Sequence, residues 1–423
     1  MKTIGQARSE LLQIFRAGVD QVNGRTVVAR YLAQHPLKHA CSLVALGKAA
    51  SAMAQGAIDA LGDSLLDGLV ISKPGHLDRE ILEARGLMAM EGGHPVPDAN
   101  SLKAGTALID YLSQLPADRP LLFLISGGTS SLVEVLNEGI QLDDLRRVNQ
   151  WLLGSGFSIE KMNQVRKSMS AIKGGGLLHH IGERRVTGLF ISDVRWDDPA
   201  VIGSGLLAAE QGDVEAVGSM KLPDWISRLT ESGNRQQLPD SPQVELHVVA
   251  SLRDAREAAA EAARALGYDT QVSHAFINAS AENAGRRLAL ELMDSLPGVY
   301  IWGGEPSVLL PDNPGRGGRN QHLALSAACV IEGADDILFL SAGTDGSDGP
   351  GADAGALVDG ATLGRAGRRG FDSELSLTGA DSGSLLAASG DLIHTGPTGT
   401  NVMDLIVGLR IAKRQEQDDE SIQ

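Results

Sequence analysis

The sequence predicts an α/β protein with two domains, and three observations support this. The chain has 423 residues, and a domain takes about 150 residues on average. Hydrophobic residues make up 43% of the chain, which is enough to form a sizeable core. Short apolar runs that do not alternate with polar residues are separated by segments with helical periodicity. This order is typical of largely parallel sheets that helices cover on both faces.

The first domain is expected to span residues 1–238, and residues 1–34 have helical periodicity. A strand, a glycine loop and a small-residue helix follow in "CSLVALGKAASAMAQGAIDAL", and a strand and turn in "LDGLVISKPG". The segment "HPVPDANSLKAGTALIDYL" is a proline-bounded loop and a helix, with Asp98 or Ser101 as the expected N-cap. The clearest unit is "RPLLFLISGGTSSLVEVL", a buried strand, a loop and an apolar helix. Another strand, "VTGLFISDV", ends in an acidic loop.

The second domain is expected to span residues 243–415. The polar stretch from 210 to 242 is the best candidate for a linker. After it, strands and helices alternate again through "VELHVVAS", "GVYIWGGE", "DILFLSAGTDGSDGPGADAGA" and "GDLIHTGPTGTNVMDLIVGL". The last residues, roughly fifteen of them, are charged, and we expect them to be frayed.

Composition excludes several classes of function. The formal net charge is −16, which argues against nonspecific binding to nucleic acid or to an anionic membrane. The two cysteines, Cys41 and Cys329, are too few for a disulfide framework or a cysteine metal site. The N-terminus reads as an amphipathic helix rather than a signal peptide, and no apolar stretch of about 18 residues occurs. We therefore expect a cytoplasmic protein.

Ligands of α/β proteins collect at the carboxyl ends of strands, and two predicted strand ends carry candidate anion-binding groups. The loop "SGGTSS" offers backbone N–H groups and hydroxyls ahead of a helix; its members are Ser126, Gly127, Gly128, Thr129 and Ser130. A tight turn with a Ser/Thr cap explains the same residues equally well. Lys48 follows another strand and is a candidate phosphate contact, although a solvated lysine is the simpler interpretation.

The segment "QVRKSMSAIKGGG" places Arg166, Ser170 and Lys173 at helical spacing before a glycine stop. Either Arg166 and Lys173 face a substrate, or they stabilise the helix end. The loop "HTGPTGTNV" could bring Asn401 to a ligand, or it could be only a capped turn.

Acidic residues follow three further strands, in "SDVRWDD", "GGEPS" and "GTDGSDGPGAD". Carboxylates on such loops suit Mg²⁺, which shares its ligands with phosphates. Asx-turns are the common alternative use of loop aspartates. The candidate metal ligands are Asp193, Asp198 and Asp345, and Glu305 is a candidate for reactant binding.

The segment "GRGGRNQHLAL" places Arg316 and Arg319 on a glycine-rich turn before an apolar run. An arginine there can bind a phosphate or a carboxylate through its bidentate fork. The bare backbone of Gly317 and Gly318 would let phosphates approach, and Asn320 is a further candidate.

Motifs of three other enzyme classes are absent from the sequence. No HExxH spacing and no GxSxG elbow occurs, and no GxGxxG follows a strand. The last absence counts against nicotinamide binding in a standard dinucleotide fold.

Six blocks together resemble the bacterial glycerate 2-kinase family, whose C-terminal part is called the MOFRL domain. They are "GGHPVPDANS", "LISGGTSSL", "MSAIKGGGL", "GRGGRNQHLAL", "GTDGSDGPGADAGALVD" and "TGPTGTNVMDL", in this order over nearly the whole chain. The resemblance implies a Rossmann-like first domain with a largely parallel sheet, a MOFRL-type α/β second domain, and an active site in the cleft between them.

The resemblance also implies ATP-dependent phosphorylation of D-glycerate to 2-phosphoglycerate, with Mg²⁺. It points to Lys48 and Arg319 as active-site groups, and Asp193 is the third catalytic candidate. The alternatives are a kinase for a related small hydroxy acid, an NAD(P)H-dependent reductase of hydroxypyruvate or tartronate semialdehyde, and a non-catalytic sugar-acid sensor. The sequence does not give the oligomeric state, so a homodimer stays open.

Overall fold

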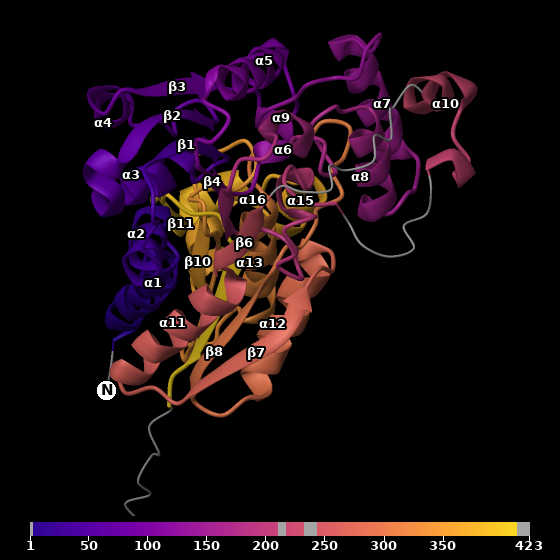
Figure 1. Ribbon diagram of the computed structural model, residues 1–423. Helices are drawn as coiled ribbons and strands as arrows, with labels where there is room; N and C mark the ends of the chain where they lie inside the picture. The colour runs from indigo at the N-terminus through magenta and orange to yellow at the C-terminus, as the bar shows by residue number, and fades with distance from the viewer. Residues whose placement is uncertain (1–2, 210–216, 232–242, 413–423) are drawn as a thin grey trace, which may run out of the picture. The chain divides into compact units, whose positions relative to one another are not determined.

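The computed structural model describes residues 3–209, 217–231 and 243–412 (Figure 1). The described chain forms two compact units, and each has its own sheet. Of the described residues, the first unit contains those of 22–251 and 399–402. The second contains those of 3–21, 252–398 and 403–412.

The first unit is built on a six-stranded sheet in the order β3-β2-β1-β4-β5-β6. All neighbouring strands are parallel, as predicted. This order is that of the Rossmann fold, and it reverses between β1 and β4, where such folds bind ligands. The strands are β1 (Cys41–Leu46), β2 (Leu65–Ser72), β3 (Leu87–Glu91), β4 (Leu121–Ile125), β5 (Val186–Ile191) and β6 (Val244–Ala250).

Helices connect these strands, and their caps follow from the sequence. The side chain of Asp98 accepts the N–H groups of Asn100 and Ser101, so Asp98 is the N-cap of α5. The helices are α2 (Gly24–Gln34), α3 (Ala50–Leu61), α4 (Arg79–Ala84), α5 (Ala99–Gln114), α6 (Thr129–Leu132), α7 (Leu142–Gly154), α8 (Ile159–Ser168), α9 (Leu178–Ile181) and α10 (Asp224–Glu231). Short 3₁₀ turns are η1 (Gly62–Ser64), η2 (Ile202–Ser204) and η3 (Val217–Ser219).

The second unit has a mixed sheet in the order β11-β10-β9-β12-β8-β7. Only β7 and β8 pair in parallel, and the other neighbours are antiparallel. This antiparallel pairing differs from the largely parallel sheet that the apolar runs predict. Apolar runs do not indicate strand direction, because a strand that is buried on both faces is apolar whether its neighbours are parallel or antiparallel. The strands are β7 (Thr270–Ile277), β8 (Gly298–Gly304), β9 (Ile337–Gly343), β10 (Gly355–Asp359), β11 (Leu392–Ile393) and β12 (Asp404–Arg410).

Helices cover both faces of this second sheet (Figure 1). On one face, α12 and α13 pack on Trp302, Phe339 and Ile406. On the other face, α1 and α11 pack on Ile301 and Leu405. The helices are α1 (Ile4–Gln21), α11 (Leu252–Ala265), α12 (Ala281–Asp294), α13 (Arg319–Val330), α14 (Thr362–Gly367), α15 (Ser373–Thr378) and α16 (Ser382–Ser389).

The two units differ from the predicted division into residues 1–238 and 243–415. Helix α1 belongs to the second unit, because its buried Phe15 packs in the same core as Leu405. Strand β6 is the edge strand of the first sheet. The predicted linker lies partly outside the described residues, and α10 forms within it.

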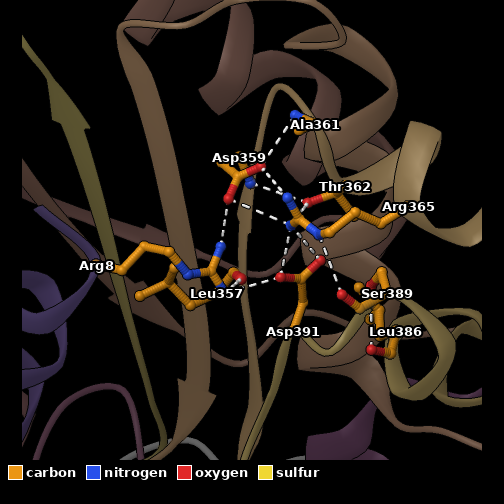
Figure 2. A network of polar contacts seen from close by, with 9 residues as sticks. All are labelled: Arg8, Leu357, Asp359, Ala361, Thr362, Arg365, Leu386, Ser389 and Asp391. Carbon is orange, nitrogen blue, oxygen red and sulfur yellow. Dashed lines mark hydrogen bonds and ion pairs between the residues drawn. The ribbon is translucent and has the colours of Figure 1, made fainter. Parts of the chain in front are cut away.

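An ionic network holds α1 in the second unit (Figure 2). Arg8 of α1 contacts Asp359 at 2.5 Å and Asp391 at 2.7 Å, and Arg365 of α14 contacts both carboxylates from another side. The side chains of Asp359 and Asp391 are buried. Burial opposes ionisation of Asp359, but Arg365, the N–H of Ala361 and Arg8 outweigh it and lower its pKa.

We expect replacement of Arg8 by methionine to lower the free energy of unfolding by about 1–2 kcal/mol, since Arg365 still pairs with both buried carboxylates. Urea denaturation would measure the loss. The control is Arg16→Met, at an exposed position of the same helix. An equal loss in both variants would contradict a stabilising role of the network.

Among the helices that the structure describes, none combines the length and the apolar character needed to cross a membrane.

Candidate functional site

In the first unit, candidate residues gather where the order of the strands reverses. The N–H of Lys48, after β1, donates to the carbonyl of Gly127, after β4, over 2.9 Å. A Cβ atom on Gly128 would lie 3.1 Å from Cγ of Lys48 and 3.2 Å from Cδ2 of His94. The two loops are therefore bonded together, with Lys48 and His94 beside the backbone of Gly128.

The backbone of Gly127 forms the floor of this cluster. A Cβ atom there would lie 2.0 Å from Oδ2 of Asp193 and 2.1 Å from Nδ2 of Asn401. Asn401 is 7% exposed, and its Nδ2 donates to Asp193 over 3.4 Å. Glycine at 127 thus makes room for a carboxylate and an amide that lie against bare backbone.

Two predicted ligands of this loop hold its structure instead. The hydroxyl of Ser126 accepts the N–H of Ala49 at 3.0 Å, and the hydroxyl of Thr129 donates to the carbonyl of Ser126 at 2.7 Å. Both side chains are fully buried. Ser130 is half-buried and bonds Ser204. The helix that follows is a single turn, so its dipole adds little to anion binding.

Lys173 and Arg166 also make internal contacts. The ammonium group of Lys173 bonds the carboxylate of Glu134, and both side chains are almost completely buried. Arg166 donates to Asn149 at 2.8 Å and to Asn163 at 3.2 Å, and burial lowers the pKa of its guanidinium. Neither residue therefore joins the cluster at the strand ends.

In the second unit, Arg319 is the first residue of α13 and is fixed by two carboxylates. Its Nε and Nη2 donate to Asp404 at 2.6 and 3.1 Å, and its Nη1 donates to Glu305 at 2.7 Å. The side chain of Asp404 is 1% exposed, while that of Glu305 is 48% exposed. The two carboxylates stand at facing ends of β12 and β8, where Asp404 pairs with Gly304.

These two carboxylates keep the guanidinium of Arg319 charged. Burial alone would lower the pKa of its guanidinium, but Asp404 and Glu305 raise it above the ordinary value for arginine. A guanidinium carries more N–H groups than these three hydrogen bonds use. Arg319 is therefore a fixed cation that can also donate to a reactant anion.

Asp348 explains the glycines before Arg319. Its carboxylate accepts the N–H groups of Asn320 and Gln321 at 3.0 and 2.8 Å and so caps α13. A Cβ atom on Gly318 would lie 2.4 Å from the carboxylate carbon of Asp348. The space at Gly318 is thus filled by a side chain of the protein rather than left for a phosphate. Gly317 has a φ of 135°, a backbone conformation that favours glycine.

Asn320 is a buried part of this support, since its Oδ1 accepts the hydroxyl of Ser341 at 2.6 Å. We therefore do not retain it among the residues that bind a reactant.

Two predicted metal ligands form Asx-turns. Oδ1 of Asp198 accepts the N–H of Ala200 at 2.8 Å, and Oδ1 of Asp345 accepts the N–H of Ser347 at 2.9 Å. Within the described ranges, no group of three His, Cys, Asp or Glu side chains is arranged to hold a metal ion. Asp193, which lies against Gly127, is the candidate metal ligand that we retain.

Sequence reasoning missed His94, Asp404 and the capping role of Asp348. A signal existed for Asp404, because it is an acidic residue at the start of an apolar run. No local signal exists for the cap, because Asp348 stands 28 residues from Asn320.

Comparison with known proteins identifies the family of the chain. Two family models match it: a domain of unknown function (DUF4147) over residues 10–222, and the MOFRL family over residues 298–404. A D-glycerate 2-kinase of Thermotoga maritima is 38% identical over 379 residues, 87% of this chain and 90% of its own. The chain belongs to the glycerate kinase family that carries a MOFRL domain.

The fold agrees with this family. A crystal structure of a glycerate kinase of Thermotoga maritima matches with a TM-score of 0.83 and 34% identity, covering 96% of this chain and 99% of its own. A relative of Agrobacterium vitis, with the provisional name of hydroxypyruvate reductase, is 36% identical over 94% of this chain and 93% of its own. Membership in the glycerate kinase family implies a kinase that takes a nucleotide and a small-molecule substrate.

Proposed function

We propose that the protein transfers the γ-phosphoryl group of ATP to the C2 hydroxyl of D-glycerate, giving 2-phosphoglycerate. The observation that carries this proposal is the fixed cation Arg319, at the start of α13 in the MOFRL domain, which Asp404 holds in place. Phosphoryl transfer depends on positioning and on neutralising charge rather than on covalent chemistry by the protein. A fork that is charged at every physiological pH and locked in one orientation meets that need.

In this mechanism Arg319 donates hydrogen bonds to the transferring phosphoryl group or to the carboxylate of glycerate. Lys48 neutralises phosphate charge near the bare backbone of Gly127 and Gly128. Asn401 keeps the carboxylate of Asp193 in place through its Nδ2. Ser130 is the hydroxyl of the loop that we retain as a reactant contact.

The residues around Gly127 fit a magnesium ion. Mg²⁺ prefers oxygen ligands and is commonly held by one or two carboxylates together with substrate phosphates. Asp193 supplies such a carboxylate, and Asn401 lies next to it. When bound, Mg²⁺ would neutralise charge on the phosphate oxygens, and Asp193 would hold it.

We expect the purified protein to consume ATP with Mg²⁺ and D-glycerate and to release 2-phosphoglycerate. A coupled assay for ADP would measure turnover, and phosphorus NMR would identify the phosphorylated carbon. Release of the 3-phospho product would contradict the proposed position. Turnover with a related hydroxy acid but not with D-glycerate would contradict the proposed substrate.

A reductase of hydroxypyruvate or tartronate semialdehyde is the second candidate, because two relatives carry the provisional name of hydroxypyruvate reductase. The first sheet has the strand order of a dinucleotide fold, but "GKAASA" follows β1 where a GxGxxG fingerprint would stand. Oxidation of NAD(P)H by the protein with hydroxypyruvate would support the reductase. The homodimer and the cytoplasmic location stay predictions.

A further inference from the structure

A second arginine of the MOFRL domain is oriented by a buried carboxylate. Nη2 of Arg316 donates to Oδ2 of Asp353 over 2.6 Å, and Nδ1 of His394 lies 2.7 Å from Oδ1 of the same residue. The side chain of Asp353 is 2% exposed, but those of Arg316 and His394 are 51% and 69% exposed. One buried anion thus holds two exposed nitrogen-bearing groups.

The fold places Arg316, Asp353 and His394 at one end of the strands of the second sheet. Gly355, at the start of β10, pairs with Ala342 of β9 and with Ile393 of β11. Asp353 therefore emerges beside His394, the residue after β11. The backbone of Arg316 is bonded independently, because its N–H donates to Asp381 and its carbonyl accepts the N–H of Gly383, both at 2.8 Å.

Arg316 and Arg319 are held in the same way, each by a buried carboxylate at the same end of the sheet. Arg319 is held by Asp404 at the start of β12, and Arg316 is held by Asp353 just before β10. Strand β9 lies between β10 and β12, so the backbones of β10 and β12 are about 10 Å apart, or two strand spacings. The loop of residues 316–319 spans this interval and carries both cations.

The contact with Asp353 also determines what His394 can do. The carboxylate of Asp353 accepts Nδ1–H and so fixes the orientation of the imidazole ring. In the protonated ring Nε2–H is then the donor that meets an anion, because a neutral ring bonded in this way has only an acceptor at Nε2. Arg316 keeps N–H groups beyond the one bound to Asp353. Both side chains can therefore contact the same anion while their hydrogen bonds to Asp353 fix their orientation.

We propose that Arg316 and His394 form a second oxyanion-binding site, oriented by Asp353, beside the site of Arg319. Its ligand is an oxyanion of a reactant, either a phosphate group of the nucleotide or the carboxylate of the hydroxy acid. This proposal rests on the proposed kinase function. Arg316 and His394 contact the ligand, and Asp353 is a positioning residue.

The test compares Arg316→Gln with the control Arg287→Gln, at an exposed arginine that pairs with Glu291. We expect Arg316→Gln to raise KM for one reactant about tenfold and to change kcat less than about threefold. A rise confined to ATP assigns a phosphate, and a rise confined to D-glycerate assigns the carboxylate. The Arg287→Gln variant should leave both constants unchanged.

The positioning role is tested by a double-mutant cycle. Asp353→Asn should raise the same KM as Arg316→Gln, and the effect of the double variant should be smaller than the sum of the two, because Asp353 acts in part through Arg316. His394→Gln should raise the same KM by a smaller factor. Arg316→Lys keeps the charge and should recover part of the lost affinity if the ligand is an anion.

Direct binding separates this proposal from the proposed reaction. Calorimetry with ADP, inorganic tripolyphosphate and D-glycerate needs no turnover. Weaker binding of one of these probes to folded Arg316→Gln supports the site, even for a protein that does not phosphorylate glycerate. Unchanged KM values and affinities for every reactant overturn it.

Discussion

Replacement of Arg319 by lysine should lower kcat for glycerate phosphorylation by at least about a hundredfold, with a smaller change in KM. The Nε and Nη2 groups of Arg319 grip Asp404, and Nη1 reaches Glu305. An ammonium group keeps the charge but cannot reproduce this fork, so it would neither be held in the same orientation nor donate in the same directions. Steady-state kinetics with ATP and D-glycerate would measure the loss.

Lysine is chosen because the partner carboxylate is buried. The side chain of Asp404 is 1% exposed, and a neutral or acidic residue at 319 would leave its charge unpaired. Circular dichroism should show that Arg319→Lys is folded, and Arg287→Lys provides the control at an exposed ion pair. Activity within about threefold of the parent would remove Arg319 from the reaction centre.

The sequence predicted the architecture of the first unit well. Strands β1, β2, β4 and β5 are apolar runs that were predicted, whereas β3 was not predicted and β6 was assigned to the second domain. The predicted sites follow from where parallel strands end. Lys48, Gly127 and Asp193 come together for this reason, since their loops follow neighbouring strands of one parallel sheet. Arg319 was likewise identified from its glycine-rich turn.

The sequence could not show which polar side chains are satisfied inside the protein. Lys173 and Glu134 are 39 residues apart, and each looks like a surface residue until the fold buries both. Ser126 was predicted as a ligand because of its loop, yet its hydroxyl bonds the backbone of a neighbouring loop. Local patterns indicate candidate residue types, whereas long-range pairing decides which of them remain available.

The same limit applies to the unit boundaries and to strand direction. Helix α1 is amphipathic in sequence, but only the packing of Phe15 with the core of the second sheet assigns it to that unit. The strands of the second sheet are as apolar as those of a parallel sheet, because helices cover them on both faces.

Replacement of Asp348 by alanine should lower the free energy of unfolding by about 2–4 kcal/mol. Asp348 bonds two backbone N–H groups at the start of α13 and the side chains of Asn320 and Gln321. Helix α13 is buried along most of its length, so the N–H groups that lose Asp348 would not form hydrogen bonds with water instead. Denaturation in urea would measure the loss, and Asp372→Ala, at the cap of α15, is the matched control.

The ionisation of Asp348 should also make stability depend on pH. Burial raises its pKa to about 6 and the nearby charge of Asp404 adds to this, although the N–H groups of Asn320 and Gln321 and the charge of Arg319 act in the opposite direction. Between the unfolded value of 3.8 and the folded value of about 6, the folded state binds more protons than the unfolded state. The contribution of this group to stability therefore increases as the pH falls through that window.

Asp348→Asn tests this sign, because asparagine has a similar shape but does not titrate. The free energy of unfolding of the parent, measured relative to that of the variant, should rise by about 2–3 kcal/mol between pH 7 and pH 4. Global acid effects are common to both proteins and cancel in this difference. A difference that stays constant over the window would show that Asp348 is ionised throughout it, so that Arg319 and the amides of α13 hold the carboxylate charged despite its burial.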